Sequence, residues 1–224
     1  MNNIPSLIQY LSAFVTEARL KRFEEVLVNR TRHIAIGLEN IYQAHNASAV
    51  LRSCDCFGIQ DVHIIENQNK YSFNPDVSLG SEKWLTLSRY DNGEQSLGTC
   101  IDTLKAKGYT IAVTSLHKDS YTIENVPITN KTALFFGTEM RGASPELESK
   151  ADMFVKIPML GFTESFNISV AAALSMYVLS SRLRKENIAW QLSDANKDEL
   201  RLQWLRNTIP KVELIEKDFT GKSL

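Results

Sequence analysis

The sequence predicts an α/β fold, with a mainly parallel β-sheet and helices on both of its faces. Short runs of aliphatic, β-branched and aromatic residues alternate along the chain with longer segments of helical periodicity. Apolar runs connected by helices are typical of parallel strands that are buried on both faces. Hydrophobic residues make up 43% of the 224 residues, which is enough for a sizeable core. We therefore expect one large domain with helical appendages.

The strands are expected where apolar runs are bounded by turn residues, at 33–37, 62–66, 84–90, 110–116, 132–137 and 153–157. Between and after them, helical periodicity predicts helices at 46–56, 95–107, 145–151 and 165–184. Further helical segments lie at 5–29, 194–207 and 211–217, and Pro210 breaks the last two apart. The chain then divides into an N-terminal helical extension (1–32), a central domain (33–185) and a C-terminal helical extension (186–224).

Charge and cysteine usage limit the class of protein. The formal net charge is −1, so a nucleic-acid partner would have to be held by local basic patches. Three cysteines are too few, and an odd number, for a disulfide framework, which favours a reducing compartment. The start of the chain lacks a basic region before its apolar run, and no apolar run is long enough for a membrane span. We expect a cytoplasmic protein with no membrane association.

Several common enzyme sites are disfavoured. No Gly-x-Gly-x-x-Gly follows the first strand, and no Gly-x-Ser-x-Gly occurs. Residues 137–144 fit parts of a P-loop, but Ala143 stands where the phosphate-binding lysine would be. Cys54 and Cys56 lie on one expected helix and point different ways, so we expect core cysteines and no metal site.

The segment 157–173 is the most informative part of the chain. It reads as a strand end, a polar loop and an abrupt helix of small residues, in which Ser165, Asn167 and Ser169 stand where the helix begins. Their side chains can cap free N–H groups or reach into a site. Polar segments also follow two other strands, at 45–52 and 137–142. Because ligands bind outside the carboxyl ends of parallel strands, these loops should converge on one site.

These three segments resemble the motifs of the SpoU/TrmH family of RNA ribose 2′-O-methyltransferases, in the SPOUT superfamily. The motifs occur in the family's order over residues 33–184, as Asn46-x5-Arg52, Phe136-Gly137-Thr138-Glu139-x-x-Gly142 and Ile157-Pro158-Met159-x-Gly161-x3-Ser165-Phe166-Asn167-Ile168-Ser169. Phe166 departs from the family, which usually has leucine there. The flanking segments, including 16–27, 38–40 and 74–84, are most similar to family members that methylate guanosine 18 in the D-loop of tRNA.

The resemblance implies a deep trefoil knot in the C-terminal half of the sheet, a homodimer, and S-adenosyl-L-methionine bound in the knot. It implies that the cofactor pocket is lined by Thr114, Ser115, Leu116, Gly137, Ile157, Met159 and Phe166. The apolar members of this set are also plausible core residues. The residues expected to act on the substrate are Arg52, Asn46, Glu139, Ser165 and Asn167.

Methylation requires the ribose 2′-hydroxyl to attack the methyl group in line, so catalysis is mostly positioning and proton removal. Arginine resists deprotonation, with a pKa above about 12. We therefore favour a role in which Arg52 grips a flanking phosphate and stabilises the developing alkoxide; a guanidine base would require a strongly perturbed site. Asn46 would orient Arg52 or the ribose, or cap its helix. Glu139 would pair with Arg52, while Ser165 and Asn167 would position the substrate or the loop, or cap the helix.

Basic residues in three places are expected to contact RNA phosphates, namely Arg19, Arg22, Arg30, Lys83, Arg182 and Arg184. In the expected homodimer, the last core helix and the helix of the first motif meet the partner, so that Arg52 of one subunit faces RNA near the other's cofactor. Two alternatives stay open: methylation of ribosomal RNA, and a non-catalytic RNA-binding or assembly protein. The presence of Arg52, Glu139 and Asn167 argues against the second.

Overall fold

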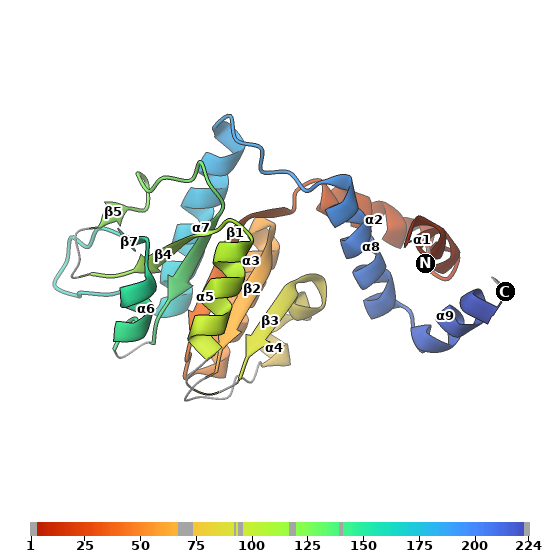
Figure 1. Cartoon of the computed structure of the whole chain (residues 1–224), viewed down its shortest axis with the longest axis horizontal. Helices are drawn as coiled ribbons and strands as arrows, with labels where there is room; N and C mark the ends of the chain where they lie inside the picture. The colour runs from red at the N-terminus through yellow and green to blue at the C-terminus, as the bar shows by residue number, and fades with distance from the viewer. Residues whose placement is uncertain are drawn as a thin grey trace. The chain divides into compact units, whose positions relative to one another are not determined.

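The computed structural model describes residues 4–66, 74–91, 93, 96–116, 120–138 and 141–221. The chain forms two compact units, shown with their elements in Figure 1. Residues 31–190 form the central unit, and residues 1–30 combine with 191–224 in a helical unit.

A parallel sheet forms the middle of the central unit. Within the described residues it has seven strands in the order β3-β2-β1-β6-β4-β7-β5, and every neighbouring pair is parallel. The strands are β1 (Thr31–Glu39), β2 (Ile59–Ile65), β3 (Thr86–Tyr90), β4 (Thr110–Thr114), β5 (Tyr121–Thr122), β6 (Thr132–Phe136) and β7 (Met153–Lys156). This arrangement confirms the predicted mainly parallel sheet.

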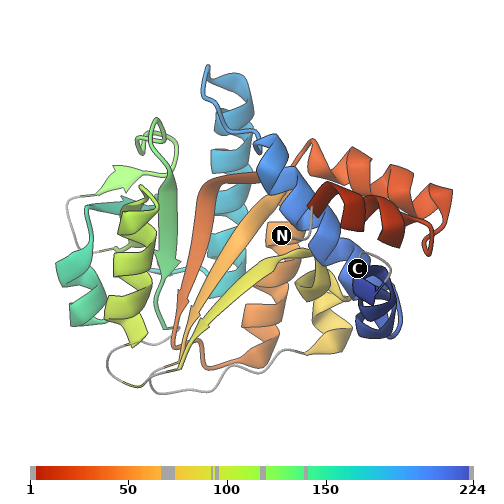
Figure 2. The ribbon, with the colours of Figure 1, turned by 45° about the vertical axis from the view of Figure 1, so that its right-hand side comes forward.

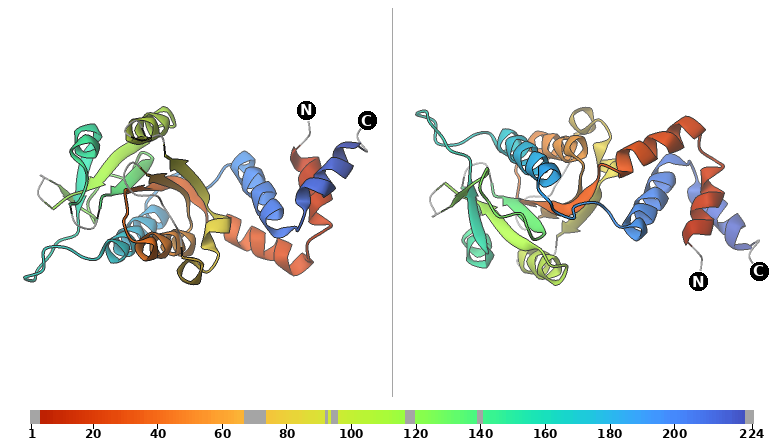
Figure 3. Two further views of the ribbon diagram at one scale, coloured as in Figure 1. Left: turned by 90° about the horizontal axis from the view of Figure 1, so that it is seen from below. Right: turned by 90° about the horizontal axis from the view of Figure 1, so that it is seen from above.

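Helices cover both faces of the sheet, as predicted, and Figure 3 shows the two layers edge-on. On one face α3 (Ala44–Phe57) packs beside α7 (Ile168–Lys185), and the short α4 (Pro75–Ser78) and 3₁₀ helix η1 (Ser81–Trp84) adjoin α3. On the other face lie α5 (Ser96–Ala106) and α6 (Pro145–Lys150). Figure 2 shows the same layers from a second side.

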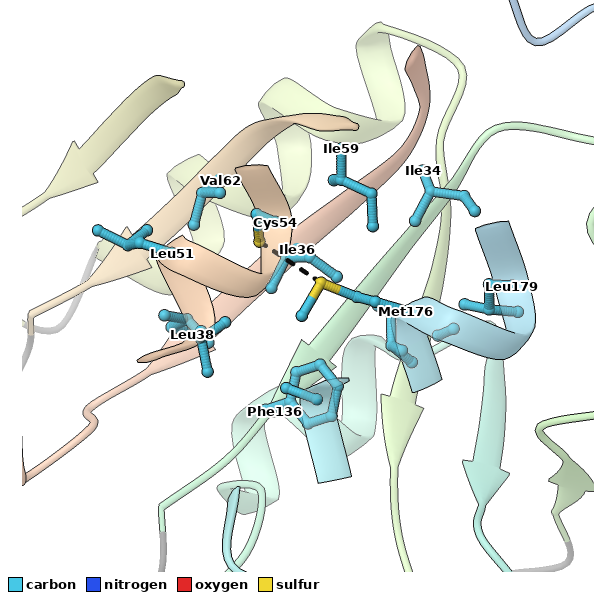
Figure 4. Close-up of a cluster of buried hydrophobic side chains, with 14 of the residues drawn as sticks. Ile34, Ile36, Leu38, Leu51, Cys54, Ile59, Val62, Phe136, Met176 and Leu179 are labelled. Atoms are coloured by element: carbon cyan, nitrogen blue, oxygen red, sulfur yellow. Dashed lines mark hydrogen bonds between the residues drawn. The ribbon is translucent and has the colours of Figure 1, made fainter. Parts of the chain in front are cut away.

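The strands are apolar on both sides because each side meets a helix layer. Ile34, Ile36 and Leu38 of β1 belong to the core under α3 and α7, where Cys54 Sγ lies 3.6 Å from Met176 Sδ (Figure 4). Strand residues that point to the opposite face, such as Ala35 and Phe135, belong to the core under α5. This two-sided burial explains why the sequence shows continuous apolar runs instead of alternation.

Glycine at position 37 is required by packing within the sheet. Gly37 of β1 pairs with Phe135 of β6, and a Cβ at position 37 would lie 2.4 Å from the Phe135 ring. The missing side chain therefore makes room for a large aromatic ring on the neighbouring strand.

Three local expectations need correction. The strand expected from Trp84 begins only at Thr86, because Trp84 ends the 3₁₀ turn. The two-residue strand β5 was not expected, since it is too short to give a periodic signal. Cys56 is exposed and therefore not a core residue, whereas Cys54 is buried as expected.

The segments before and after the central unit combine in one helical unit. The single helix expected at 5–29 is divided into α1 (Ile4–Ser12) and α2 (Glu17–Leu27), where Thr16 caps α2 by accepting from Arg19 N. These helices pack with α8 (Asp194–Thr208) and α9 (Val212–Gly221). Among the described residues, no helix has the length and apolar character to cross a bilayer.

Arg30 has a structural role in this unit, which contradicts its assignment to RNA binding. It is 1% exposed, and its guanidinium lies 5.5 Å from the ring centroid of Trp204. Phe23 contacts the same Trp204 ring edge-on, at 5.5 Å between centroids. A buried guanidinium over an indole cannot reach a phosphate, so Arg30 belongs to the core of the helical unit.

A buried histidine gives the central unit a dependence on pH. His63 on β2 is 3% exposed, and its Nδ1 lies 3.1 Å from the Tyr90 hydroxyl oxygen. Burial, with a smaller effect of Lys107, lowers the pKa of His63 to about 4. The native protein therefore holds this ring neutral, while the unfolded chain protonates it near its ordinary pKa of about 6.5.

We predict that the free energy of unfolding falls by on the order of 3 kcal/mol from about pH 7 to about pH 4 because of His63 alone. In this window the unfolded chain binds a proton that the native protein does not, so stability is lost as the pH falls. Urea unfolding of His63→Gln should show a flatter dependence. His45→Gln, at an exposed histidine, is the matched control and should leave the slope unchanged. Equal slopes for wild type and His63→Gln would contradict the assignment.

Candidate functional site

A pocket of about 500 Å³ opens at the carboxyl ends of β4, β6 and β7. Its volume is in the range of sites for small molecules. The lining includes all seven residues expected to bind a cofactor, together with Ser165 and Asn167 of the expected substrate set. The parallel sheet thus brings together segments that lie far apart in the sequence.

The first wall of the pocket is the loop 137–144 after β6. Thr138 N donates to the Gly142 carbonyl at 2.8 Å, and Gly142 N donates back to the Thr138 carbonyl at 3.0 Å. Gly142 has a φ of 69°, in the left-handed region that favours glycine. A Cβ on Gly137 would lie 2.2 Å from the backbone of Gly142 and Ala143. The turn is therefore folded tightly onto the end of its own strand. Glu139 lies outside the described residues.

A carboxylate from another strand holds the far end of this wall. Glu39, the last residue of β1, accepts hydrogen bonds from Ser144 N at 2.9 Å and from Ser144 Oγ at 2.5 Å. Ser144 Oγ in turn accepts from Leu147 N at 3.1 Å and caps α6. Burial raises the pKa of Glu39, and the two bonds from Ser144 oppose this shift.

The second wall consists of residues 157–167 and the start of α7. The helix begins at Ile168, and its cap is Asn167, whose Oδ1 accepts from Ser169 N at 2.9 Å and from Ser169 Oγ at 2.6 Å. Ser165 is therefore not a cap, because it lies in the exposed loop before the helix and lines the pocket. Of the three residues that the sequence offered as caps, Ser165, Asn167 and Ser169, only Asn167 has this role.

Asn46 holds the second wall from α3. Its Oδ1 accepts from Asn167 Nδ2 at 3.2 Å, and its Nδ2 donates to Gln43 Oε1 at 3.1 Å. The N-cap position of α3 is Gln43, so the capping role considered for Asn46 is wrong. Asn46 instead joins the first turn of α3 to the first turn of α7.

Arg52 does not lie at the pocket of its own chain. It is exposed on α3 and is absent from the pocket lining. Six residues along an α-helix correspond to about one and two-thirds turns, so Arg52 and Asn46 project from different sides of α3. Within the part of the chain that the structure describes, Arg52 takes part in no ion pair. With respect to the described residues, this guanidinium is available to another molecule.

Sequence reasoning missed several charged residues of the pocket. Arg141, Lys156, Glu148 and Glu164 all line it. Arg141 stands at a variable position of the second motif and Glu164 at one of the third, so the motif pattern gave no reason to select them. The pocket is therefore lined by both positively and negatively charged side chains.

The lining suits a ligand that joins a flat apolar ring to positively charged groups. Leu116, Ile157, Met159 and Phe166 provide apolar surface for a ring. The carboxylates of Glu148 and Glu164 can face a cation. These features fit S-adenosyl-L-methionine, which has an adenine ring, an ammonium and a sulfonium.

Two of the arginines expected to bind RNA have their donors committed inside the chain. Arg182 donates from Nη1 to the Val126 carbonyl at 2.8 Å and from Nε to Glu186 at 3.0 Å. Arg184 donates to the Phe57 carbonyl at 3.1 Å and lies over the Trp190 ring, 5.2 Å from its centroid. Both guanidiniums stabilise the central unit, which argues against their assignment as phosphate contacts.

The remaining basic residues of that set are exposed, namely Arg19, Arg22 and Lys83. Arg22 shares its charge with Glu25, at 3.3 Å between Nη1 and a carboxylate oxygen. Because exposed pairs of this kind are weak, the guanidinium can exchange this partner for a phosphate.

Comparison with known proteins places the chain beside RNA-modifying enzymes. The family model described as the SpoU rRNA Methylase family matches residues 33–177. The chain is 47% identical over 209 residues to the tRNA (guanosine(18)-2′-O)-methyltransferase of Borreliella burgdorferi, covering 93% of this chain and 94% of that protein. It is 38% identical over 162 residues to the protein of the same name from Thermus thermophilus, covering 72% of this chain and 81% of that protein.

A solved structure shows the same fold. The crystal structure of the A. aeolicus TrmH/SpoU tRNA modifying enzyme superposes with a TM-score of 0.76 at 31% identity, covering 87% of this chain and 98% of that one.

We predict that Gly137→Ala lowers the free energy of unfolding by about 1–3 kcal/mol, because the new methyl group meets backbone that no side-chain rotation can clear. The loop 138–143 should move, and the pocket should lose its ligand. Urea unfolding and calorimetric titration with S-adenosylhomocysteine measure the two effects.

The matched control is Gly98→Ala in α5, where an added Cβ has no neighbour within 4 Å. This change should leave binding intact and leave stability unchanged or raised by about 0.5–1 kcal/mol. If Gly137→Ala were as stable as wild type and bound the ligand equally, the close approach at Gly137 would not matter to the site.

Proposed function

The chain belongs to the SpoU rRNA Methylase family, and we propose that it transfers a methyl group from S-adenosyl-L-methionine to the ribose 2′-hydroxyl of guanosine 18 in tRNA. The observation that carries the choice of substrate is the 47% identity, over 93% of the chain, to a tRNA (guanosine(18)-2′-O)-methyltransferase. The pocket supports it, since the loops that bear the second and third motifs converge there. A methyltransferase that acts on tRNA would work in the cytoplasm.

The pocket is the proposed site of the methyl donor, which supplies an electrophilic methyl group on a sulfonium. Ile157, Met159 and Phe166 would hold its ring between apolar surfaces, as Leu116 would from the end of β4. The carboxylates of Glu148 and Glu164 would balance its positive charges. The tightly folded loop 137–144 presents backbone groups that would give the ligand its orientation.

We propose a homodimer, because α7 carries an apolar stripe on the side away from the sheet. Val170, Leu174 and Tyr177 follow one another at helical spacing and are 44%, 40% and 61% exposed. An apolar stripe of this kind is typical of a surface that another protein covers. Since α3 packs beside α7, a second copy on this surface would bring its pocket toward Arg52 of the first.

In this dimer Arg52 would complete the partner's site. Its guanidinium has five N–H donors and a permanent positive charge, which suit a phosphate beside the target ribose and the oxyanion that develops on the 2′-oxygen. The ribose proton would pass to phosphate or water, because a guanidinium is a donor with no acceptor atom. Asn46 and Asn167 would act as one bonded pair that sets α3 against α7. The exposed Arg19, Arg22 and Lys83 would contact RNA phosphates elsewhere.

We further propose that residues of the C-terminal half of the sheet form the deep trefoil knot of the SPOUT superfamily. The close backbone approach at Gly137 supports this, since a chain threaded through a loop needs positions without side chains. The parallel order of β6, β4 and β7 is also compatible with it.

The proposed reaction predicts that the purified protein methylates an unmodified tRNA transcript from labelled S-adenosyl-L-methionine. The label should map to the ribose of guanosine 18 as a bond that resists alkaline hydrolysis. A transcript with adenosine at that position is the control and should take up little label. Incorporation into ribosomal RNA but not tRNA would replace the proposed substrate. No incorporation into either would favour a binding protein.

A second prediction concerns Arg52. We expect Arg52→Ala to lower kcat about 10²- to 10³-fold or more, as when one stabilising donor is removed from an active site. Binding of S-adenosylhomocysteine should stay within about twofold of wild type, because Arg52 is not part of the pocket lining. Stopped assays at saturating tRNA and calorimetry measure the two quantities.

Mixed dimers test whether Arg52 acts on the partner's site. Arg52→Ala chains would be combined with Ile157→Arg chains, whose pocket is filled by the new side chain. If Arg52 and the pocket come from different subunits, one site of each mixed dimer is intact and activity returns. If activity stays absent although mixed dimers form, the proposed arrangement is wrong.

A further inference from the structure

Glu39 is a buried carboxylate that neither the proposed chemistry nor the sheet explains. It is 1% exposed, and within the described residues it takes part in no ion pair. An unpaired carboxylate is costly to bury, as its raised pKa reflects. It does not line the pocket, so it cannot contact a ligand there. Both of its hydrogen bonds go to a single residue, Ser144.

The two bonds to Ser144 fix the wall of the pocket at its far end. The wall begins at Gly137, which continues β6, and ends at Ser144, the cap of α6. Between these points Thr138 and Gly142 close the turn through their paired backbone bonds. Among the side-chain bonds of the described residues in this turn, those from Glu39 are the ones that tie it to a different strand.

The residues thus held are the ones that face the ligand. Thr138, Arg141, Gly142 and Ala143 all line the pocket, and so does Glu148 from the helix that Ser144 caps. A displaced Ser144 would move this wall and the Glu148 carboxylate together. The carboxylate of Glu39 is suited to this task because it accepts from the backbone N–H and the hydroxyl at once, which a neutral side chain does less strongly.

We propose that Glu39 is a positioning residue for the methyl donor: through Ser144 it holds residues 141–143 and Glu148 at the spacing that the donor requires. The proposal rests on the proposed function, because it takes S-adenosyl-L-methionine as the ligand of the pocket. Glu39 acts from behind the wall and touches neither substrate.

The test compares three variants with a charge-matched control, by calorimetric titration of each protein with S-adenosylhomocysteine in the absence of RNA. Glu39→Ala should weaken binding about tenfold or more, because both bonds to Ser144 are lost. Glu39→Gln keeps one oxygen acceptor for Ser144 N and should bind with an intermediate affinity. Ser144→Ala keeps the backbone bond to Glu39 but removes the hydroxyl bond, together with the cap that Ser144 Oγ gives to Leu147 N, and should also be intermediate. The control is Glu146→Gln, an exposed residue in the first turn of α6, which should stay within about twofold of wild type.

Two further readings separate positioning from general loss of stability. In methylation assays, Glu39→Gln should raise KM for S-adenosyl-L-methionine and leave KM for tRNA unchanged. Hydrogen exchange should quicken at the amides of 138–143 in Glu39→Ala, with exchange in β1 and β6 unchanged. In the double variant Glu39→Ala/Ser144→Ala, the loss of binding free energy should be smaller than the sum of the two single losses, because both changes break the same contact.

If the Glu39 variants melted at lower temperature but bound S-adenosylhomocysteine with the affinity of wild type, the role would be structural only and the proposal would be wrong. A higher KM for tRNA with normal donor affinity would overturn it equally. If wild type itself bound no S-adenosylhomocysteine, the proposed function would fail, whereas unchanged exchange at 138–143 in Glu39→Ala would refute the contact itself. If Glu39→Ala does not fold, the donor affinities of Glu39→Gln and Ser144→Ala test the proposal in the same way.

Discussion

The site depends on one constraint, the parallel pairing of every neighbouring strand in the sheet. Parallel strands end at the same edge, so the connections after β4, β6 and β7 open side by side although they are distant in the sequence. Parallel pairing also requires crossover connections, and here helices cover the sheet on both faces and leave it few positions for polar side chains. The polar residues of the pocket therefore stand at the ends of strands, as Thr114 and Lys156 do, or in the loops and helices that follow the strands. The rigidity of the site comes from the strands behind it.

Much of this architecture can be predicted from the sequence, because the strands are long apolar runs that meet a helix on each side. The second and third family motifs likewise identify residues that the structure gathers around one pocket. Short or distant features escape such reasoning. The strand β5 has two residues and no periodic signal. The hydrogen bonds that Ser144 donates to Glu39 join residues 105 positions apart, and no local sequence pattern predicts them.

The roles of the basic residues could not be predicted either, because the sequence does not show which groups a basic side chain contacts in the folded chain. Arg30, Arg182 and Arg184 look like surface arginines in the sequence, but they stack on tryptophans or donate to carbonyls within the chain. Long side chains of this kind cover apolar surface as readily as they reach for a phosphate. The helix start at Ile168 is a similar case. Several polar residues precede it, and only the geometry of the first turn identifies Asn167 as the cap.

The bond between Asn46 and Asn167 has a consequence for how the two substrates affect each other. Helix α3 bears Arg52 on one side and, through Asn46, holds the entrance of its own pocket on the other. In the proposed dimer, the same helix thus serves the partner's RNA and its own methyl donor. If RNA displaced α3, the affinity for the donor would change, and thermodynamic linkage requires the donor to change the affinity for RNA by the same factor. A displacement of α3 would then couple the two active sites of the dimer, so that the two subunits would not turn over independently.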